Sequence, residues 1–214
     1  MIIEQIMQQD VVTLFPENTL EEAIKTMNSR HIRHLPIVSK DGLLAGILSD
    51  RDLKDASPSI FELKDRMNEL KKPVSTIMKK DVITCHPLDF VEEISAVFYE
   101  HRIGCVPVIK HKKLVGIVTE TDLLHTFVQL TGANQPGSQI EVKVQNKAGI
   151  LSEVTAVFQK RKVNIASVLV YPDSNEQLKI LVFRVQTMNP MGLITDLKKE
   201  GYKVLWPNFP EISS

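Results

Sequence analysis

The organisation of this chain follows from two short stretches, Gly46-Ile47-Leu48-Ser49-Asp50-Arg51-Asp52-Leu53 and Gly116-Ile117-Val118-Thr119-Glu120-Thr121-Asp122-Leu123. Each predicts an apolar strand that ends at a hydroxyl residue, followed by a helix with an aspartate three residues further on. A hydroxyl at a helix N-cap leaves backbone N–H groups pointing outward, where they suit a phosphate. The aspartate one turn later suits the hydroxyls of a ribose. The same pattern is also the capping box, which needs no ligand, and both interpretations stay open.

The two stretches occupy equivalent places in a longer repeat. One constant offset pairs Met7 with Met78, Thr13 with Thr84 and Pro36 with Pro107. The loop before the closing strand is one residue shorter in the second copy, after which Gly46 aligns with Gly116 and Asp52 with Asp122. A doubled pattern of this kind indicates two copies of one structural unit.

The repeated motifs resemble the CBS domain family, in which two adjacent repeats form a Bateman module. In the first copy the resemblance rests on Met7 to Thr13, on His-Leu-Pro-Ile-Val at 34–38 and on Gly-Ile-Leu-Ser-Asp-Arg-Asp at 46–52. The second copy has Met78 to Thr84, Cys-Val-Pro-Val-Ile at 105–109 and Gly-Ile-Val-Thr-Glu-Thr-Asp at 116–122. Together these motifs cover roughly the first 125 residues.

This resemblance implies two clefts between the repeats and a regulatory adenosine-containing ligand, such as AMP, ATP or S-adenosylmethionine, rather than a cofactor. Asp52 and Asp122 are expected to hold ribose hydroxyls, Ser49 and Thr119 to meet phosphate, and Thr13 and Thr84 to border the base. The full set of expected nucleotide-binding residues is Thr13, Arg33, His34, Pro36, Ser49, Arg51, Asp52, Thr84, Pro107, Thr119 and Asp122.

Arg33 and His34 come just before a predicted strand, where a cation would face the start of the Ser49 helix. They are either a phosphate contact or part of a solvated loop. The second repeat has Gly104 and Cys105 at these positions, so any ligand site there is expected to be less favourable to anions. His31 and His34 have no third ligand at a useful spacing, and no metal site is expected.

Within the first repeat, the pattern predicts a short helix over 1–8, a strand over 11–14 and a helix capped by Asn18 or Thr19. Strands over 35–38 and 43–48 follow, joined by an Asp-Gly turn. A connector helix is expected from Ser59, with apolar residues at 60, 63, 67 and 70 and a stop at Pro73. The expected boundaries are 1–56 for repeat 1, 57–73 for the connector, 74–130 for repeat 2, 131–138 for a linker, 139–207 for a third domain and 208–214 for a tail.

The third domain has a different pattern. Ile140 to Val144 alternates apolar and charged residues, and the order of elements that follows is βαββαβ, which packs two helices on one face of a four-stranded antiparallel sheet. This order and Asn-x-x-Gly-x-Leu at 146–151 resemble the ACT domain family, whose members bind amino acids or similar small molecules. The expected fold class is therefore α/β of the α+β kind, with tandem CBS repeats forming a Bateman module and a ferredoxin-like βαββαβ ACT domain.

The resemblance implies that a small molecule contacts Asn146, Gly149, Ile150 and Leu151. That family often has Asp where this chain has Asn146, and Pro where it has Ala148. Asn146 keeps an oxygen that caps the helix or accepts from an amine, but it has no charge. The alternative is a structural turn in which Gly149 permits close backbone approach.

Composition restricts the function classes. The 26 basic and 26 acidic residues balance, which argues against a nucleic-acid binder built on a basic face. No apolar run reaches membrane-spanning length and no signal peptide is visible, so we expect a cytoplasmic protein that does not bind membranes. In that compartment Cys85 and Cys105 are expected to be free thiols.

A CBS pair followed by an ACT domain resembles the acetoin utilisation proteins of spore-forming bacteria, which implies a role in acetoin or butanediol catabolism without catalysis. The chain has no nucleophile–base set, P-loop or Cys-x-x-Cys. We therefore expect a ligand-sensing regulator that forms a homodimer and acts on a protein partner. The competing hypothesis is an interaction protein with non-functional ligand sites that docks on an enzyme of the acetoin pathway.

Overall fold

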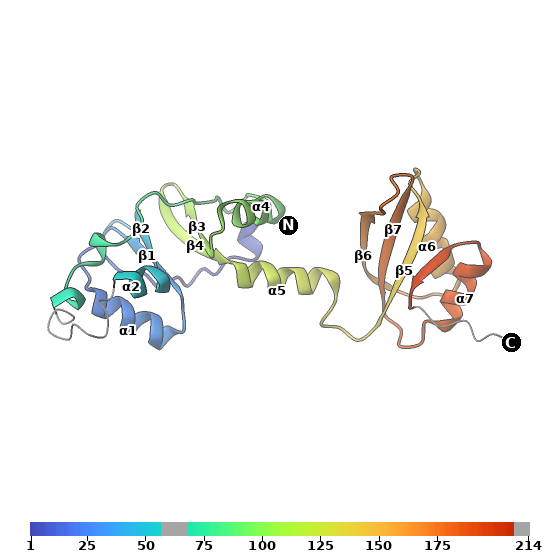
Figure 1. The fold of residues 1–214 in the computed structure, drawn as a ribbon, viewed down its shortest axis with the longest axis horizontal. Coiled ribbons are helices and arrows are strands. Elements are labelled where there is room, and N and C mark those ends of the chain that lie inside the picture. Colours follow the sequence, from blue (N-terminus) through green and yellow to red (C-terminus); the bar gives the residue numbers. More distant parts are fainter. Residues whose placement is uncertain (57–67, 208–214) are drawn as a thin grey trace. The chain divides into compact units, whose positions relative to one another are not determined.

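The computed structural model describes residues 1–56 and 68–207, and it divides the chain into two compact units, 1–124 and 125–214 (Figure 1). The first unit holds both repeats except for the part of the second that follows Leu124. Most of the expected connector helix from Ser59 lies outside the described residues. No helix in the described ranges is both long and apolar enough to cross a membrane.

In the first repeat, η1 (Ile3–Gln5) is followed by α1 (Leu20–Arg30), β1 (His34–Val38), β2 (Leu44–Ser49) and α2 (Asp50–Ala56). Strands β1 and β2 form an antiparallel hairpin. The prediction of a helix over 1–8 was too long, since only one 3-10 turn forms. The predicted strand over 11–14 was wrong, because only Leu14 makes an isolated parallel bridge, to Ile37.

The start of α1 follows from local sequence. The Thr19 hydroxyl accepts a hydrogen bond from the Glu22 N–H, and the Glu22 carboxylate accepts from the Thr19 N–H, which completes a capping box. The helix ends at His31, whose backbone is left-handed. Leu20, Ala23 and Met27, which recur at helical spacing, are buried.

The second repeat has the same order: η2 (Val74–Thr76), α4 (Val91–His101), β3 (Cys105–Lys110), β4 (Lys113–Thr119) and α5 (Glu120–Thr131). Strands β3 and β4 form the second antiparallel hairpin. Cys85 bridges Val108 in the same parallel sense in which Leu14 bridges Ile37. The structure therefore confirms that the doubled motifs form two similar units.

The leading segments of the two repeats are exchanged. Ile3, Ile6 and Met7 pack in the core of the second repeat, although they precede the first in sequence. The corresponding residues Val74, Ile77 and Met78 pack in the core of the first repeat. Two isolated antiparallel bridges mark the crossings, Gln8 with Ile117 and Ile47 with Lys79. Each hydrophobic core therefore needs residues from both repeats.

The aligned glycines Gly46 and Gly116 lie where the exchanged segments cross. A Cβ on Gly46 would lie 2.8 Å from the Lys79 carbonyl oxygen and 2.9 Å from the Met78 sulfur. A Cβ on Gly116 would lie 2.7 Å from the Met7 sulfur and 3.1 Å from the Gln8 carbonyl oxygen. The closest atom is backbone in the first case and a flexible side chain in the second.

We expect Gly46→Ala to destabilise the first unit by about 1–3 kcal/mol, because a backbone oxygen must move to admit the methyl group. Gly116→Ala is the matched control and should cost less, because a methionine side chain can rotate away. Urea unfolding followed by circular dichroism measures both changes. The transition seen by fluorescence of Trp206, which lies in the second unit, should not move; an equal cost for the two variants would contradict this explanation.

The second unit has β5 (Ser138–Gln145), α6 (Ile150–Lys160), β6 (Ile165–Pro172), β7 (Leu178–Val185), α7 (Met191–Lys199) and β8 (Lys203–Trp206). The antiparallel sheet has the order β6-β7-β5-β8, which confirms the predicted βαββαβ arrangement. Helices α6 and α7 lie on one face of the sheet (Figure 1). The core between them is formed by alternate strand residues such as Ile140, Val142 and Phe183, and by Val154 and Leu197 of the helices.

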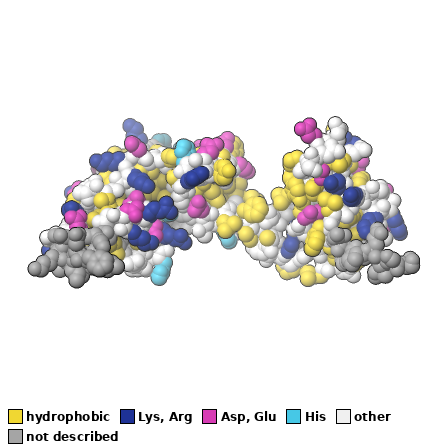
Figure 2. Space-filling model, in the orientation of Figure 1, with side chains coloured by type: hydrophobic (Ala, Val, Ile, Leu, Met, Phe, Trp, Pro, Cys, Tyr) yellow, Lys and Arg dark blue, Asp and Glu magenta, His cyan; other side chains and the backbone are white. Residues whose placement is uncertain are grey.

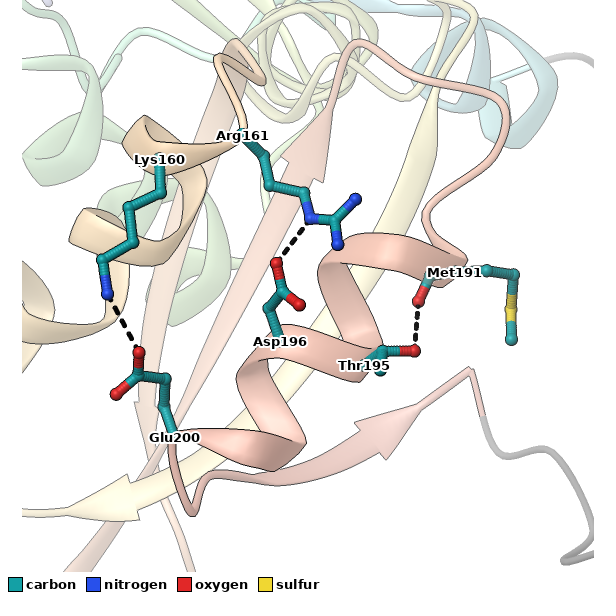
Figure 3. A network of polar contacts seen from close by, with 6 residues as sticks. All are labelled: Lys160, Arg161, Met191, Thr195, Asp196 and Glu200. Carbon is teal, nitrogen blue, oxygen red and sulfur yellow. Dashed lines mark hydrogen bonds and ion pairs between the residues drawn. The ribbon is translucent and has the colours of Figure 1, made fainter.

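Two ion pairs join the helices on their outer side (Figure 3). Arg161 Nε lies 2.6 Å from an Asp196 carboxylate oxygen, and Lys160 Nζ lies 2.9 Å from Glu200. The Arg161 side chain donates a hydrogen bond to Asp196, which lowers the pKa of that carboxyl below its ordinary value. These contacts tie the end of α6 to α7.

The segment after α5 is held on the second unit. The Ser167 hydroxyl donates to the Thr131 carbonyl at 2.8 Å, and Arg184 Nη2 donates to the Gln135 carbonyl at 2.7 Å. Both donors come from strands of the sheet, at paired positions of β6 and β7. Although its composition is that of a loop, part of this segment is therefore fixed by hydrogen bonds to the sheet.

Candidate functional site

Both copies of the hydroxyl-x-x-Asp motif form a capping box. Asp52 Oδ2 accepts hydrogen bonds from the Ser49 N–H at 2.8 Å and the Ser49 hydroxyl at 2.5 Å, and the Asp52 N–H donates to that hydroxyl at 3.2 Å. Thr119 and Asp122 repeat the arrangement at 2.8, 2.6 and 3.3 Å. The capping interpretation is thus confirmed in both repeats. The hydrogen bonds of the capping box orient each aspartate whether or not a ligand binds.

The second carboxylate oxygen of each aspartate meets the exchanged segment. Asp52 Oδ1 lies 3.4 Å from Lys79 Nζ, whereas Asp122 Oδ1 accepts a hydrogen bond from Gln8 Nε2 at 3.0 Å. Burial raises the pKa of Asp52, but hydrogen bonds from Ser49 and the nearby Lys79 ammonium outweigh it, so the pKa lies below its ordinary value. Asp52 is therefore an ionised acceptor at neutral pH, with room to accept a further hydrogen bond.

A cleft of about 360 Å³ opens beside Asp52. Five of the predicted nucleotide-binding residues line it: Arg33, His34, Ser49, Arg51 and Asp52. Six others are not part of its lining: Thr13, Pro36, Thr84, Pro107, Thr119 and Asp122. Of these, Pro36 and Pro107 are buried in β1 and β3, where they pair with Ile47 and Ile117.

None of the other eleven lining residues was predicted to bind a nucleotide. They are Ile47, Asp50, Lys79, Asp81, Val82, Ile83, Arg102, Ile103, Gly104, Cys105 and Glu120. Most of them belong to the second repeat. Lys79 comes from the leading segment that crosses to β2, whereas Arg102 to Cys105 come from the connection between α4 and β3 and from the first residue of β3. The offset between the repeats pairs Lys79 with Gln8, but this signal does not say which segments cross.

His34 lies at the point where the two repeats meet. A Cβ on Gly104 would lie 2.9 Å from the His34 ring, so the imidazole in this position packs directly against the glycine. Burial lowers the pKa of His34, and Arg33 lowers it further, although Asp50, Glu120 and Asp52 act in the opposite direction. The folded protein therefore favours neutral His34.

Since the pKa of His34 is lowered on folding, the unfolded chain binds more protons as the pH falls through the ordinary value of 6.5. We expect the free energy of unfolding of the first unit to decrease from pH 7 to pH 5, and His34→Gln to reduce that slope. Asp50 and Asp52 have lowered pKa values and do not titrate in this range. Urea unfolding at several pH values measures the slope; exposed His101→Gln is the control, and an equal change in both variants would contradict the assignment.

Both cysteines are free, as expected, and both are buried. Cys105 lines the cleft, while Cys85 lies in the core of the second repeat. Burial raises the pKa of each thiol to about 12, with smaller contributions from Asp89 at Cys85 and Glu120 at Cys105. Neither thiol is a ready nucleophile in the folded state.

We expect both thiols to react with iodoacetamide at pH 8 at least roughly a hundredfold more slowly in the native protein than in urea, because alkylation needs the thiolate. Mass spectrometry of labelled peptides separates Cys85 from Cys105. Rapid native labelling of either residue would show that its burial is not maintained in solution.

The predicted site of the second unit is a turn between β5 and α6. Gly149 is the N-cap of α6 with a φ of 82°, and nothing lies within 4 Å of an added Cβ. Glycine is therefore favoured here because the backbone has a positive φ, and the explanation by close backbone approach was wrong. Asn146 does not cap the helix either, since its amide donates to the Glu176 carbonyl at 3.3 Å. Ile150 is buried in the core, whereas Leu151 is exposed.

Family comparisons agree with this architecture. The CBS domain model matches residues 3–59 and 74–129, and the ACT domain model matches residues 138–199. A CBS domain-containing protein of Dictyostelium discoideum is 34% identical over 142 residues, which are 64% of this chain and 98% of that protein. Several other relatives are longer enzymes, of whose length the chain covers 25% or less.

Two solved structures resemble the CBS part. One is a protein from Vibrio cholerae named for acetoin utilization (AcuB), with a TM-score of 0.56 and 30% identity over 63% of this chain and 96% of the other. The other is the CBS domain pair of protein MJ0100, solved in complex with 5′-methylthioadenosine and S-adenosyl-L-methionine. It has a TM-score of 0.52 and 28% identity over 63% of this chain and 98% of that chain.

Proposed function

The chain belongs to the CBS domain family, with two CBS repeats and a C-terminal ACT domain, and we propose that it is a non-catalytic regulator that binds an adenosine-containing ligand in the cleft beside Asp52. The similar CBS pair of MJ0100 was solved with two ligands of that class, which supports the proposal. The proposed site is the cleft of about 360 Å³ that both repeats line.

The orientation of Asp52 carries the proposal. Its Oδ2 is held by Ser49, so Oδ1 stays fixed at the edge of the cleft and can accept from a ribose hydroxyl. Apolar side chains of the same lining, Val82, Ile83 and Ile103, offer a surface for a base. The Ser49 hydroxyl is already engaged with Asp52, so the cations of the cleft are better placed than Ser49 to meet phosphate.

A ligand in this cleft would act on both repeats, because the lining includes β2 of the first and the leading segment of the second. Helix α5 starts at the capping box of the second repeat and ends at Thr131, whose carbonyl accepts from Ser167 of the ACT domain. We infer that a change in the angle between the repeats reaches the ACT domain through α5. Linked affinities at two sites would establish this coupling as allosteric.

Three further parts of the proposal rest on resemblance. Similarity to a protein named for acetoin utilization supports a role in acetoin or butanediol catabolism. An amino acid or related small molecule is the proposed ligand of the ACT domain, near the turn at 146–151. We also propose a cytoplasmic homodimer with a regulated protein partner, because Bateman modules and ACT domains of related proteins commonly pair between chains.

A second candidate function is a docking protein whose clefts bind no ligand. Three large apolar side chains of α5 favour it, since Leu124, Phe127 and Leu130 are 63%, 57% and 53% exposed and recur every three residues. The capping boxes are satisfied without a ligand, which is also consistent with this alternative.

Calorimetric titration of AMP, ADP, ATP, S-adenosylmethionine and NADH tests the proposal. We expect at least one of them to bind, and Asp52→Asn to weaken binding about ten- to hundredfold, because a charge-assisted hydrogen bond contributes about 1.5–3 kcal/mol. Asp122→Asn is the matched control, since it alters the same capping box in the other repeat.

Thermal unfolding of the two variants separates loss of a cap from loss of a ligand contact, because similar stabilities with different affinities indicate a contact. Equal losses of affinity in the two variants would contradict the role of Asp52. A wild-type protein that binds none of the five compounds would favour the docking function.

A further inference from the structure

Four cations line the cleft: Arg33, Arg51, Lys79 and Arg102. Lys79 pairs with Asp52 at 3.4 Å. Among the described residues, the side chains of the three arginines have no hydrogen-bond or ion-pair partner, although carboxylates line the same cleft. One of those carboxylates, Asp50, instead pairs with Lys54 at 3.1 Å. Three guanidinium groups thus converge on one cavity with their donors available to a bound anion.

The other repeat lacks these cations. Asp122 contacts Gln8 where Asp52 contacts Lys79, so the contacts themselves confirm that these two positions are equivalent. The same correspondence pairs Arg51 with Thr121 and Arg102 with His31. Arg33 corresponds to Gly104, and both of these line the cleft.

The acidic residues of the cleft, in contrast, correspond to acidic residues in the other repeat. Asp52 corresponds to Asp122, Asp81 to Asp10, and Asp50 to Glu120. The cleft beside Asp52 therefore has four cations and four carboxylates. The positions that correspond to this lining under the repeat also have four carboxylates, but Arg33 is the one Lys or Arg among them. The difference is three positive charges, which belong to Arg51, Lys79 and Arg102.

We infer that the cleft beside Asp52 selects a nucleotide with two or more phosphates, and that one such ligand binds per chain. This inference rests on the proposed function, since it identifies the class of adenosine ligand. Phosphate groups meet the guanidinium groups and Lys79, while Asp52 holds the ribose. The corresponding face of the other repeat repels the same ligand, because its carboxylates are not balanced by cations.

Titration calorimetry with adenosine, AMP, ADP and ATP, without divalent cations, tests the inference. We expect one site per chain and an affinity that rises about tenfold with each added phosphate up to ADP, since each gains charge-assisted hydrogen bonds. S-adenosylmethionine, which has no phosphate, should bind no more tightly than adenosine. Inorganic tripolyphosphate should bind more weakly than ATP, because it lacks the ribose and base.

The decisive variant replaces the three cations by the residues of the other repeat: Arg51→Thr, Lys79→Gln and Arg102→His together. Its affinity for ADP and ATP should fall to that for adenosine, while adenosine itself binds within about threefold of wild type. Binding of adenosine also shows that the variant is folded. The reciprocal variant, Gln8→Lys with His31→Arg and Thr121→Arg, should raise the stoichiometry for ATP from one to two per chain.

The outcomes separate the two proposals. Equal affinities for adenosine, ADP and ATP, or two equivalent sites in the wild type, would overturn the inference and leave an adenosine sensor. Tripolyphosphate binding as tightly as ATP would show an oligophosphate site instead and would also overturn the inference. Failure of every adenosine compound to bind would overturn the proposed function itself.

Discussion

The exchange of leading segments between the repeats is the constraint on which the rest of the first unit depends. Ile3 and Met7 fill the core of the second repeat, and Val74 and Met78 fill the core of the first, so neither repeat buries its apolar surface alone. The crossings bring the Lys79 carbonyl close to Gly46 and the Met7 side chain close to Gly116. The same crossing brings Lys79 to Asp52, so the cleft beside Asp52 is a direct consequence of how the cores are completed.

One motif serves folding and, in our proposal, binding. In each repeat the hydroxyl residue and the aspartate cap a helix, and the hydrogen bonds that start the helix also fix the direction of the carboxylate. What distinguishes the two copies is the residue that crosses from the other repeat, Lys79 in one case and Gln8 in the other. Symmetric folding is thus compatible with asymmetric electrostatics, because caps depend on local sequence and clefts on their neighbours.

The periodic segments were predictable from sequence, since strand alternation and helical spacing are local consequences of burying one face. This applies to α1, to the paired hairpins and to the βαββαβ order of the second unit. The prediction was wrong for residues 11–14, where an apolar run makes a single bridge. The turn at Gly149 was predicted, but the reason given for the glycine was wrong, since it is needed for its positive φ. At 11–14 the neighbouring strand decided the outcome, and no local pattern reveals it, whereas at Gly149 the backbone conformation of the turn is the reason for glycine.

By itself, the sequence determined the two CBS repeats, the ACT domain, the capping boxes and the candidate residues Arg33, His34, Ser49, Arg51 and Asp52. Only the tertiary structure decided that Lys79, Arg102 and Ile103 join them in one cleft while Thr13 and Thr84 are not part of its lining. The physical reason is that the cleft forms where segments distant in sequence cross, and a repeat offset specifies equivalence but not contact. Local patterns follow from hydrogen bonds within a few residues, whereas the charge of the cleft depends on which repeat supplies each wall.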